Sequence, residues 1–320
     1  MKQKKEYAPR VIALGTFDGV HLGHQELISR GKKWAEKHGC QLRVCTFDRH
    51  PLEILCPEKA PKLLTTPEEQ AEKMKAAGAE EIQVIPFTRE TAETEPEDFL
   101  AALRSECTLQ AVVAGWNYTF GRKGRGNAEL LEQDGKKHGY QVEIVPPVRT
   151  AAGEIISSTA IREKLVRGDA EGAREMLGSP YGITGTVVSG KHQGTRIGFP
   201  TANIRTAEKK LLPAYGVYIC RLISGKECWN AVVNIGTQPT IPSGFVTVEA
   251  HALDTEIDLY GRLARVELLK HIRGEVRFQD VEALKAQICL DREAARTWFA
   301  RQKEAGAKAE NPFFPQGSLI

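Results

Sequence analysis

Short apolar runs alternate with longer amphipathic stretches over the first half of the chain. The runs are rich in β-branched residues, as buried strands are, and cover Val11–Leu14, Leu42–Phe47, Ile82–Ile85, Ala111–Ala114 and Val142–Val145. The stretches between them have helical spacing and cover Gln25–His38, Glu68–Ala77, Pro96–Ser105 and Ala128–His138. This alternation predicts an α/β domain with a doubly wound parallel sheet. Ligands of such sheets bind beyond the carboxyl ends of the strands.

After about residue 181 the pattern changes to closely spaced strands without long helices between them. We expect these strands at Ile183–Val188, Val217–Leu222, Cys228–Asn234, Val246–Leu253 and Leu263–Leu269. Their spacing predicts an all-β unit, an antiparallel β-barrel. The last stretch, Val281–Phe299, predicts a terminal helix whose apolar face carries Val281, Leu284, Ile288, Ala295 and Phe299.

The change of pattern and the length of 320 residues both indicate two domains. The join lies in the helical segment Ala160–Leu177 and in the turn Gly178–Pro180 that follows it. We therefore expect one domain over residues 1–178, a second over residues 179–305, and an extended tail over residues 306–320.

Composition and charge narrow the class of protein. Hydrophobic residues make up 41% of the chain and charged residues 27%, which suits a packed core. The net charge of +3 gives no reason to expect a nucleic-acid partner. Seven scattered cysteines without a CxxC pair favour reduced thiols, and no run of about 18 apolar residues predicts a membrane span. We expect a soluble, cytoplasmic protein without a membrane partner.

A glycine-broken turn after the first strand carries two histidines. In the segment Gly15–Gln25, His21 and His24 are three residues apart at the head of a helix, so their side chains share one face. A helix N-terminus offers free amides to a phosphate, and Gly23 lets a nucleotide approach the backbone. The segment predicts a nucleoside triphosphate site in which the histidines bind phosphates; the alternative is two surface histidines. Further contributors to this site are Gly15, Thr16 and Phe17.

A second segment, Ile156–Arg162, begins a helix with hydroxyl side chains and carries a cation in its first turn. Arg162 suits a phosphate because its guanidinium is a planar fork of donors. The expected cap donors are Ser157, Ser158 and Thr159. The alternative is an ordinary helix cap with a solvated arginine. Adenylyl transfer needs mainly positioning and charge stabilisation, which these groups can supply.

A glycine-rich loop follows the first strand of the second half. Its backbone amides can cradle phosphates, and its glycines are Gly185, Gly190, Gly194 and Gly198. Thr201 and Asn203 come next and lie on one face of an extended chain, because they are two residues apart. Their oxygen atoms could both bind a Mg²⁺ that bridges phosphates.

The N-terminal motifs resemble those of the bacterial bifunctional riboflavin kinase and FAD synthetase family. They occur in the family order and are Gly15–Gln25, Thr46–Pro51, Gly115–Gly121 and Ile156–Arg162. The resemblance implies an FMN adenylyltransferase of the HxGH nucleotidyltransferase type, with His21 and His24 as catalytic residues. It implies flavin or nucleotide binding by Asp48, His50 and Asn117; for the first two, turn capping is the alternative. Arg49 replaces a common proline and Asn117 a common aspartate, so we assign no metal to Asn117.

The C-terminal motifs resemble riboflavin kinase. Residues 182–203 match its signature, and further matches are Gly216–Tyr218, Asn234–Gly236, Pro239–Thr240, Val248–His251 and Asp258–Gly261. The resemblance implies that Glu249 is the general base for the ribityl 5′-hydroxyl; the alternative is a glutamate on the solvated face of a strand. Thr195 stands where the family usually has arginine, and we assign no catalytic role to Arg196.

The resemblance implies a bifunctional enzyme that makes FMN from riboflavin and ATP, and FAD from FMN and ATP, with Mg²⁺ in both steps. Two alternatives stay open: a chain with one of the two activities, and a flavin-binding regulator without turnover. Both phosphate motifs and Glu249 argue against a pure binder. The sequence leaves the oligomeric state open, a homo-oligomer included.

Overall fold

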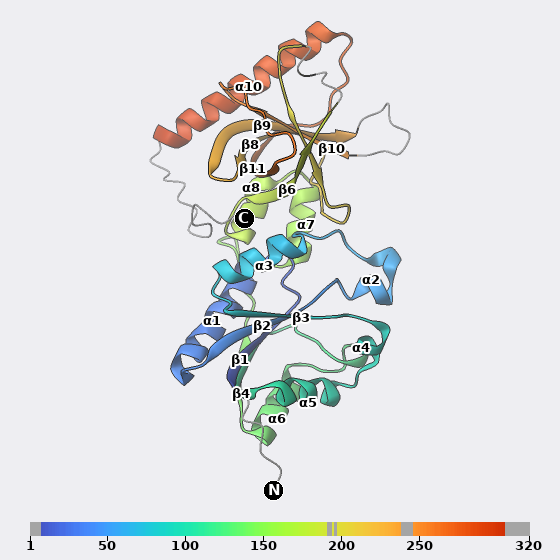
Figure 1. The fold of residues 1–320 in the computed structure, drawn as a ribbon, viewed down its shortest axis with the longest axis vertical. Helices are drawn as coiled ribbons and strands as arrows, with labels where there is room; N and C mark the ends of the chain where they lie inside the picture. The colour runs from blue at the N-terminus through green and yellow to red at the C-terminus, as the bar shows by residue number, and fades with distance from the viewer. Residues whose placement is uncertain (1–7, 191–193, 195–196, 238–245, 305–320) are drawn as a thin grey trace. The chain divides into compact units, whose positions relative to one another are not determined.

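The computed structural model describes residues 8–190, 194, 197–237 and 246–304 (Figure 1). The chain divides into two compact units, Met1–Ser158 and Thr159–Ile320. The expected helical join forms two helices, α7 (Ser158–Val166) and α8 (Ala170–Leu177). The domain boundary after residue 178 stays a prediction. The expected tail over residues 306–320 lies outside the described residues.

The first unit is an α/β fold around a five-stranded parallel sheet of order β3-β2-β1-β4-β5. Its strands are β1 (Pro9–Leu14), β2 (Gln41–Phe47), β3 (Glu81–Ile85), β4 (Thr108–Gly115) and β5 (Gln141–Val145). Its helices are α1 (Leu22–His38), α2 (Leu52–Leu55), η1 (Pro57–Lys59), α3 (Pro67–Ala76), α4 (Arg89–Glu93), α5 (Pro96–Glu106), η2 (Arg122–Gly124) and α6 (Ala128–His138). The predicted doubly wound sheet is confirmed. The strand order reverses between β1 and β4, and ligands of such sheets bind beyond the carboxyl ends of the strands at this point.

Both faces of this sheet are buried, which explains why its strands are continuous apolar runs. Val11 and Ala13 of β1 pack with α1 on one face. Ile12 and Leu14 pack with α5 and α6 on the other face. The alternating residues of one strand therefore fill two separate cores.

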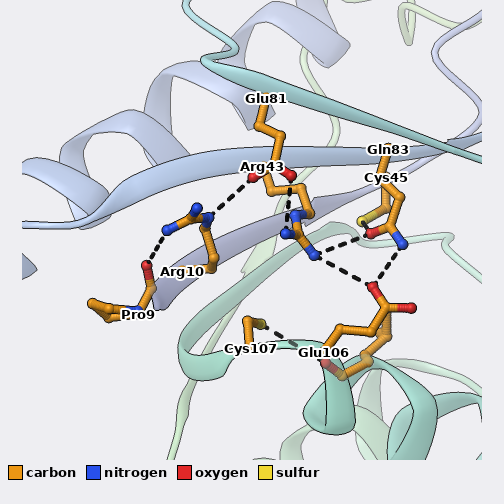
Figure 2. A network of polar contacts seen from close by, with 9 residues as sticks. Pro9, Arg10, Arg43, Cys45, Glu81, Gln83, Glu106 and Cys107 are labelled. Carbon is orange, nitrogen blue, oxygen red and sulfur yellow. Dashed lines mark hydrogen bonds and ion pairs between the residues drawn. The ribbon is translucent and has the colours of Figure 1, made fainter. Parts of the chain in front are cut away.

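A network of polar side chains ties the first three strands together on the face that α5 covers (Figure 2). Arg43 of β2 donates to Glu81 of β3 at 2.9 Å and to Glu106 at the end of α5 at 3.3 Å. Arg10 of β1 donates to the same Glu81 at 3.0 Å. These contacts fasten the amino-terminal half of the strands. The carboxyl ends remain available for ligand-binding loops.

The second unit contains a closed antiparallel barrel of order β10-β7-β6-β11-β8-β9, as predicted. Its strands are β6 (Tyr181–Val188), β7 (Ala202–Thr206), β8 (Gly216–Ser224), β9 (Glu227–Thr237), β10 (Val246–Ala252) and β11 (Leu263–Arg273). Helix α10 (Val281–Glu304) lies across the outside of the barrel, where Ala295 packs on β8 and β9 (Figure 1).

The structure differs from the sequence analysis at two places in this unit. The expected strands did not include β7, although Thr201 and Asn203 were expected on an extended chain. The residues of β7 are mostly polar, and only Ile204 is a buried apolar residue. The predicted apolar face of the last helix is not buried along its whole length, since Val281 is 52% exposed. The buried residues of α10 lie further along the helix, at Asp291 and Ala295.

Candidate active sites

The two histidines of the first unit lie against each other at the start of α1. His21 is the N-cap residue, and its Nδ1 accepts the backbone N–H of His24 at 3.3 Å. The two rings stack with centroids 3.7 Å apart and an angle of 15° between their planes. Because Nδ1 of His21 accepts a hydrogen bond, the proton of the neutral ring is on Nε2. That Nε2 is a donor at the sheet edge where α/β folds bind ligands.

Burial keeps both imidazoles neutral at physiological pH. It lowers the pKa of His21 from 6.5 to about 4. It also lowers the pKa of His24 well below its usual value, and the neighbouring His21 lowers it further. Nδ1 of His24 is buried and has no hydrogen-bond partner among the described residues. An unpaired buried nitrogen costs about 1–3 kcal/mol, so it marks a position where a ligand would restore a hydrogen bond.

The loop between β1 and α1 is strained and firmly held. Phe17 and Val20 have φ of 51° and 44°, a region that residues other than glycine rarely adopt. The buried Asp18 carboxylate between them accepts the N–H of Leu64 at 2.9 Å and that of Thr65 at 3.1 Å. Such strain persists only where surrounding contacts enforce it, and it is common at active sites.

Sequence reasoning did not single out Asp18 as part of this site. A carboxylate beside a glycine in a tight loop is a signal for capture of backbone amides. Its partners lie 46 and 47 residues away, so the contact itself was not predictable. The hydroxyl of Ser158, one of the expected cap donors, donates to the carbonyl of Asp18 at 2.8 Å. Ser158 thereby holds the histidine loop.

Glycines of the same motif lie close to its rings. A Cβ added at Gly15 would lie 3.0 Å from the Phe17 ring, and one at Gly23 would lie 3.1 Å from the His21 ring. The space beside Gly23 is therefore occupied by His21 itself. Ser157 belongs to the first unit, whereas Thr159 and Arg162 belong to the second, so their grouping with the histidines stays a prediction.

Asp48 and His50 follow β2 and line a small pocket together with Thr16. Asp48 accepts the N–H of Phe87 at 2.8 Å and pairs with Arg49 at 2.7 Å. The Arg49 guanidinium holds the pKa of this carboxyl below its usual value. Nδ1 of His50 accepts the N–H of Leu52 at 3.2 Å. Both side chains therefore cap turns and also face the pocket, so the two interpretations from sequence are compatible.

Asn117 follows β4, at the same sheet edge as the histidine loop. Its side chain is exposed, and a Cβ at Gly115 would lie 3.4 Å from its Oδ1. The structure thus brings the loops after β1, β2 and β4 to one edge of the sheet.

In the second unit, strand register brings three polar residues into one row. Glu249 of β10 pairs with Asn203 of β7 on one side and with Asn234 of β9 on the other. Directly paired residues point to the same face of a sheet. The intervening Val248 and Ala250 are buried in the barrel, so the row lies on its outer face. Asn234 was part of a motif seen in the sequence, but no role was assigned to it.

The glycine-rich loop touches the two candidate metal ligands. A Cβ added at Gly190 would lie 2.3 Å from Nδ2 of Asn203, and one at Gly194 would lie 3.4 Å from Oγ1 of Thr201. The backbone of the loop therefore lies against both side chains, which no larger residue at Gly190 would allow. A hydroxyl and an amide oxygen side by side are ligands that suit Mg²⁺, which uses few protein ligands and completes its shell with phosphates and water.

The other two glycines differ from this pair. Gly185 lies inside β6, where a Cβ would be 2.1 Å from the carbonyl oxygen of Arg205. Close strand packing accounts for it, and its phosphate contact stays a prediction. Gly198 has φ of 87° in a turn and faces open space. Seven residues of the predicted motifs lie outside the described residues: Lys191, His192, Gln193, Thr195, Arg196, Pro239 and Thr240.

Comparison with known proteins gives two family matches, one for each part of the chain. The FAD synthetase family model matches residues 3–160, and the riboflavin kinase family model matches residues 177–299. A bifunctional riboflavin kinase/FMN adenylyltransferase of Listeria monocytogenes is 38% identical over 92% of this chain and 94% of its own length. The enzyme of the same description from Bacillus subtilis is 36% identical over 94% and 96%.

A solved structure is similar over nearly the whole chain. A crystal structure from Streptococcus pneumoniae, described as a macrolide-efflux protein, has a TM-score of 0.82 and 32% identity, and the match covers 92% of this chain and 95% of that one. Within the part of the present chain that the structure describes, no helix has the length and apolar character needed to cross a membrane.

The buried, neutral state of His21 predicts loss of stability in mild acid. The unfolded chain binds a proton at this residue below about pH 6.5, while the folded chain keeps it neutral down to about pH 4. Between these values the unfolded state binds more protons, so the free energy of unfolding falls as the pH falls. The shift corresponds to about 3 kcal/mol over the whole window. Urea unfolding at several pH values measures this slope.

The matched variant for this measurement is His21→Asn, because asparagine is also a good N-cap residue and has no titrating group. Relative to this variant, the wild type should lose stability as the pH falls from about 6.5 to about 4. Parallel pH profiles for the two proteins would show that His21 does not titrate as its burial requires.

Proposed function

The chain belongs to the family of bifunctional riboflavin kinase/FMN adenylyltransferases, and we propose an assignment of its residues to the two reactions. The first reaction phosphorylates riboflavin with ATP and yields FMN and ADP. The second transfers the adenylyl group of a further ATP to FMN and yields FAD and pyrophosphate. The N-terminal part carries the adenylyltransferase and the C-terminal part carries the kinase.

For adenylyl transfer, His21 and His24 are the groups that bind the triphosphate. The observation that carries this assignment is the stacked, buried pair at the N-terminus of α1, with Nδ1 of His24 unpaired among the described residues. Neutral imidazole N–H groups act as preorganised donors to the charge that develops as pyrophosphate leaves. Backbone amides at the helix N-terminus add to this, and the surrounding loop supplies Gly15, Thr16, Phe17 and Gly23.

The remaining N-terminal residues would orient the two substrates. Asp48, His50 and Asn117 follow strands at the same sheet edge, which supports contacts to flavin or nucleotide. The proposed phosphate-binding groups of the second segment are the hydroxyls of Ser157 and Thr159 and the guanidinium of Arg162. The hydroxyl of Ser158 instead donates to the carbonyl of Asp18 and holds the histidine loop. Mg²⁺ would accompany ATP in this half as well, bound mainly by the phosphates.

For the kinase, Glu249 is the general base that accepts the proton of the ribityl 5′-hydroxyl. Its position in a row between Asn203 and Asn234 supports this, because both neighbours can hydrogen-bond a substrate beside the carboxylate. Thr201 and Asn203 would hold the Mg²⁺ of ATP, which neutralises charge on the phosphates. The backbone amides around Gly190 and Gly194 would bind those phosphates, with Gly185 and Gly198 shaping the loop.

We assign residues 1–178 to the adenylyltransferase domain, residues 179–305 to the kinase domain, and residues 306–320 to a tail. The riboflavin kinase match begins at residue 177, where α8 ends, and this supports a boundary near residue 178. The scattered cysteines support a cytoplasmic location. The assignment requires no second copy of the chain, so it holds for a monomer and for a homo-oligomer alike.

Removal of the His24 side chain should affect only the second reaction. Loss of one preorganised donor costs roughly 2.7–4 kcal/mol of transition-state stabilisation, so His24→Ala should slow FAD formation from supplied FMN by about 100-fold or more. FMN formation from riboflavin should stay near the wild-type rate. His38→Ala is the matched control, because His38 ends the same helix and stacks on Trp34. Equal loss of both activities would contradict the assignment.

Glu249→Gln should stop the first reaction while substrates still bind. General-base catalysis is worth about 100- to 10,000-fold, and glutamine keeps the shape but cannot accept the proton. Kinase turnover measures the loss, and equilibrium binding of riboflavin and ATP measures what remains. Glu227→Gln is the control, since Glu227 is an exposed residue of the same barrel that pairs with Arg262. A Glu249→Gln enzyme with a near wild-type kinase rate would remove Glu249 from this role.

A further inference from the structure

Thr201, one of the two candidate Mg²⁺ ligands, lies just outside the strand pairing of the barrel. Strand β7 begins at Ala202, which pairs with Ala250 of β10. Thr201 precedes this strand and has no place in the described ladder between β7 and β10. The backbone at Thr201 therefore needs another fixed point if its hydroxyl is to be held in place.

The side chain of His251 provides such a point. Nδ1 of His251 lies 2.8 Å from the carbonyl oxygen of Pro200, the residue directly before Thr201. A carbonyl oxygen only accepts hydrogen bonds, so the proton of the neutral ring is on Nδ1. Burial lowers the pKa of His251, which favours this neutral form. This hydrogen bond connects β10 to the chain just before β7, beyond the last backbone pair of the two strands.

Packing fixes the same segment from two further sides. The Phe199 ring meets the His251 ring edge-on, with centroids 5.9 Å apart and an angle of 78°. The Arg292 guanidinium of α10 lies 5.4 Å from the centroid of the Phe199 ring. The N–H of Phe199 donates to the carbonyl of Gly194 in the glycine-rich loop at 2.7 Å. The segment before Thr201 is thus held between β10, α10 and the loop.

An imidazole at this position carries an energetic cost. His251 is only 8% exposed, and its Nε2 is buried without a hydrogen-bond partner among the described residues. An unsatisfied buried nitrogen is unfavourable, whereas a phenyl ring of similar size would pack without it. A phenyl ring could not form the hydrogen bond that Nδ1 of His251 makes to the carbonyl of Pro200.

We propose that His251 is a positioning residue of the kinase site, which holds the carbonyl of Pro200 so that Thr201 and Asn203 present their oxygen atoms together to Mg²⁺ and ATP. The inference rests on the proposed metal-binding function of Thr201 and Asn203. His251 itself touches neither substrate nor reacting atoms in this account. The side chains of His251 and Glu249 lie on the same outer face of β10, because the two residues are two positions apart. In this account, β10 therefore positions both the proposed base and, through His251, the proposed metal ligands.

Three variants of His251 test this role, since they differ in whether a hydrogen-bond donor remains near the position of Nδ1. His251→Phe keeps the ring and its packing but lacks the donor. His251→Asn places an amide N–H near the position of Nδ1, whereas His251→Gln places it near Nε2. We expect the phenylalanine and glutamine enzymes to show a KM for Mg·ATP raised about tenfold or more, and the asparagine enzyme to stay within about threefold of wild type. Thr201→Ala, the fourth variant, reports on the metal site itself.

Kinase assays at varied Mg²⁺ and ATP give KM and kcat separately, and FAD formation from supplied FMN should be unchanged in all four variants. Thermal unfolding of each variant shows whether it is folded. A folded phenylalanine enzyme with a wild-type KM would overturn the proposal. An asparagine enzyme as impaired as the glutamine enzyme would also overturn it, because a packing role would not distinguish the two amides.

The Thr201→Ala enzyme shows whether a negative result concerns the positioning role of His251 or the metal-ligand role of Thr201 and Asn203. If Thr201→Ala leaves the Mg²⁺ dependence of the kinase unchanged, the metal-ligand assignment is wrong and the inference falls with it. If Thr201→Ala raises the Mg²⁺ requirement while His251→Phe does not, the metal site stands and only the positioning role of His251 is overturned.

Discussion

Strand register is the constraint on which the proposed kinase site depends. A slip of one residue in the pairing of β10 with β7 and β9 would turn Glu249 into the barrel and Val248 out of it. The barrel prevents this slip because Val248, Ala250 and Ile204 fill its interior. Hydrophobic packing on the inner face of the strands thus determines the position of Asn203, Glu249 and Asn234 on the outer face. The glycine-rich loop can then approach Asn203 and Thr201 at a fixed place.

The first unit fixes its site by a different means. Its strands pair in parallel, and the reversal of strand order at β1 and β4 brings their following loops to one edge. The β1–α1 loop there adopts backbone angles that are unfavourable for Phe17 and Val20. The hydrogen bonds to Asp18 offset this strain, and the burial of both histidines adds a further cost in mild acid. The loop thus holds two buried, neutral imidazoles at a cost in stability.

The sequence predicted the two folds and the placement of most motifs, because periodicity and glycine spacing report local structure. It predicted the parallel sheet, the barrel and the pairing of His21 with His24 at a helix start. It missed β7, whose residues are mostly polar, and the exposure of Val281. It also missed Asp18 and His251. Both make hydrogen bonds to residues 46 or more positions away, at Leu64 and Pro200, and such contacts leave no local pattern.

The account's central claim is that one chain performs both reactions in sequence. Incubation of the purified full-length protein with riboflavin, ATP and Mg²⁺, followed by chromatography of the flavins over time, tests it most directly. The account predicts that FMN appears first and then declines as FAD accumulates, with one ADP formed per riboflavin consumed and one pyrophosphate per FAD. A reaction that ends at FMN, or one that leaves riboflavin unchanged while supplied FMN is converted to FAD, would contradict it.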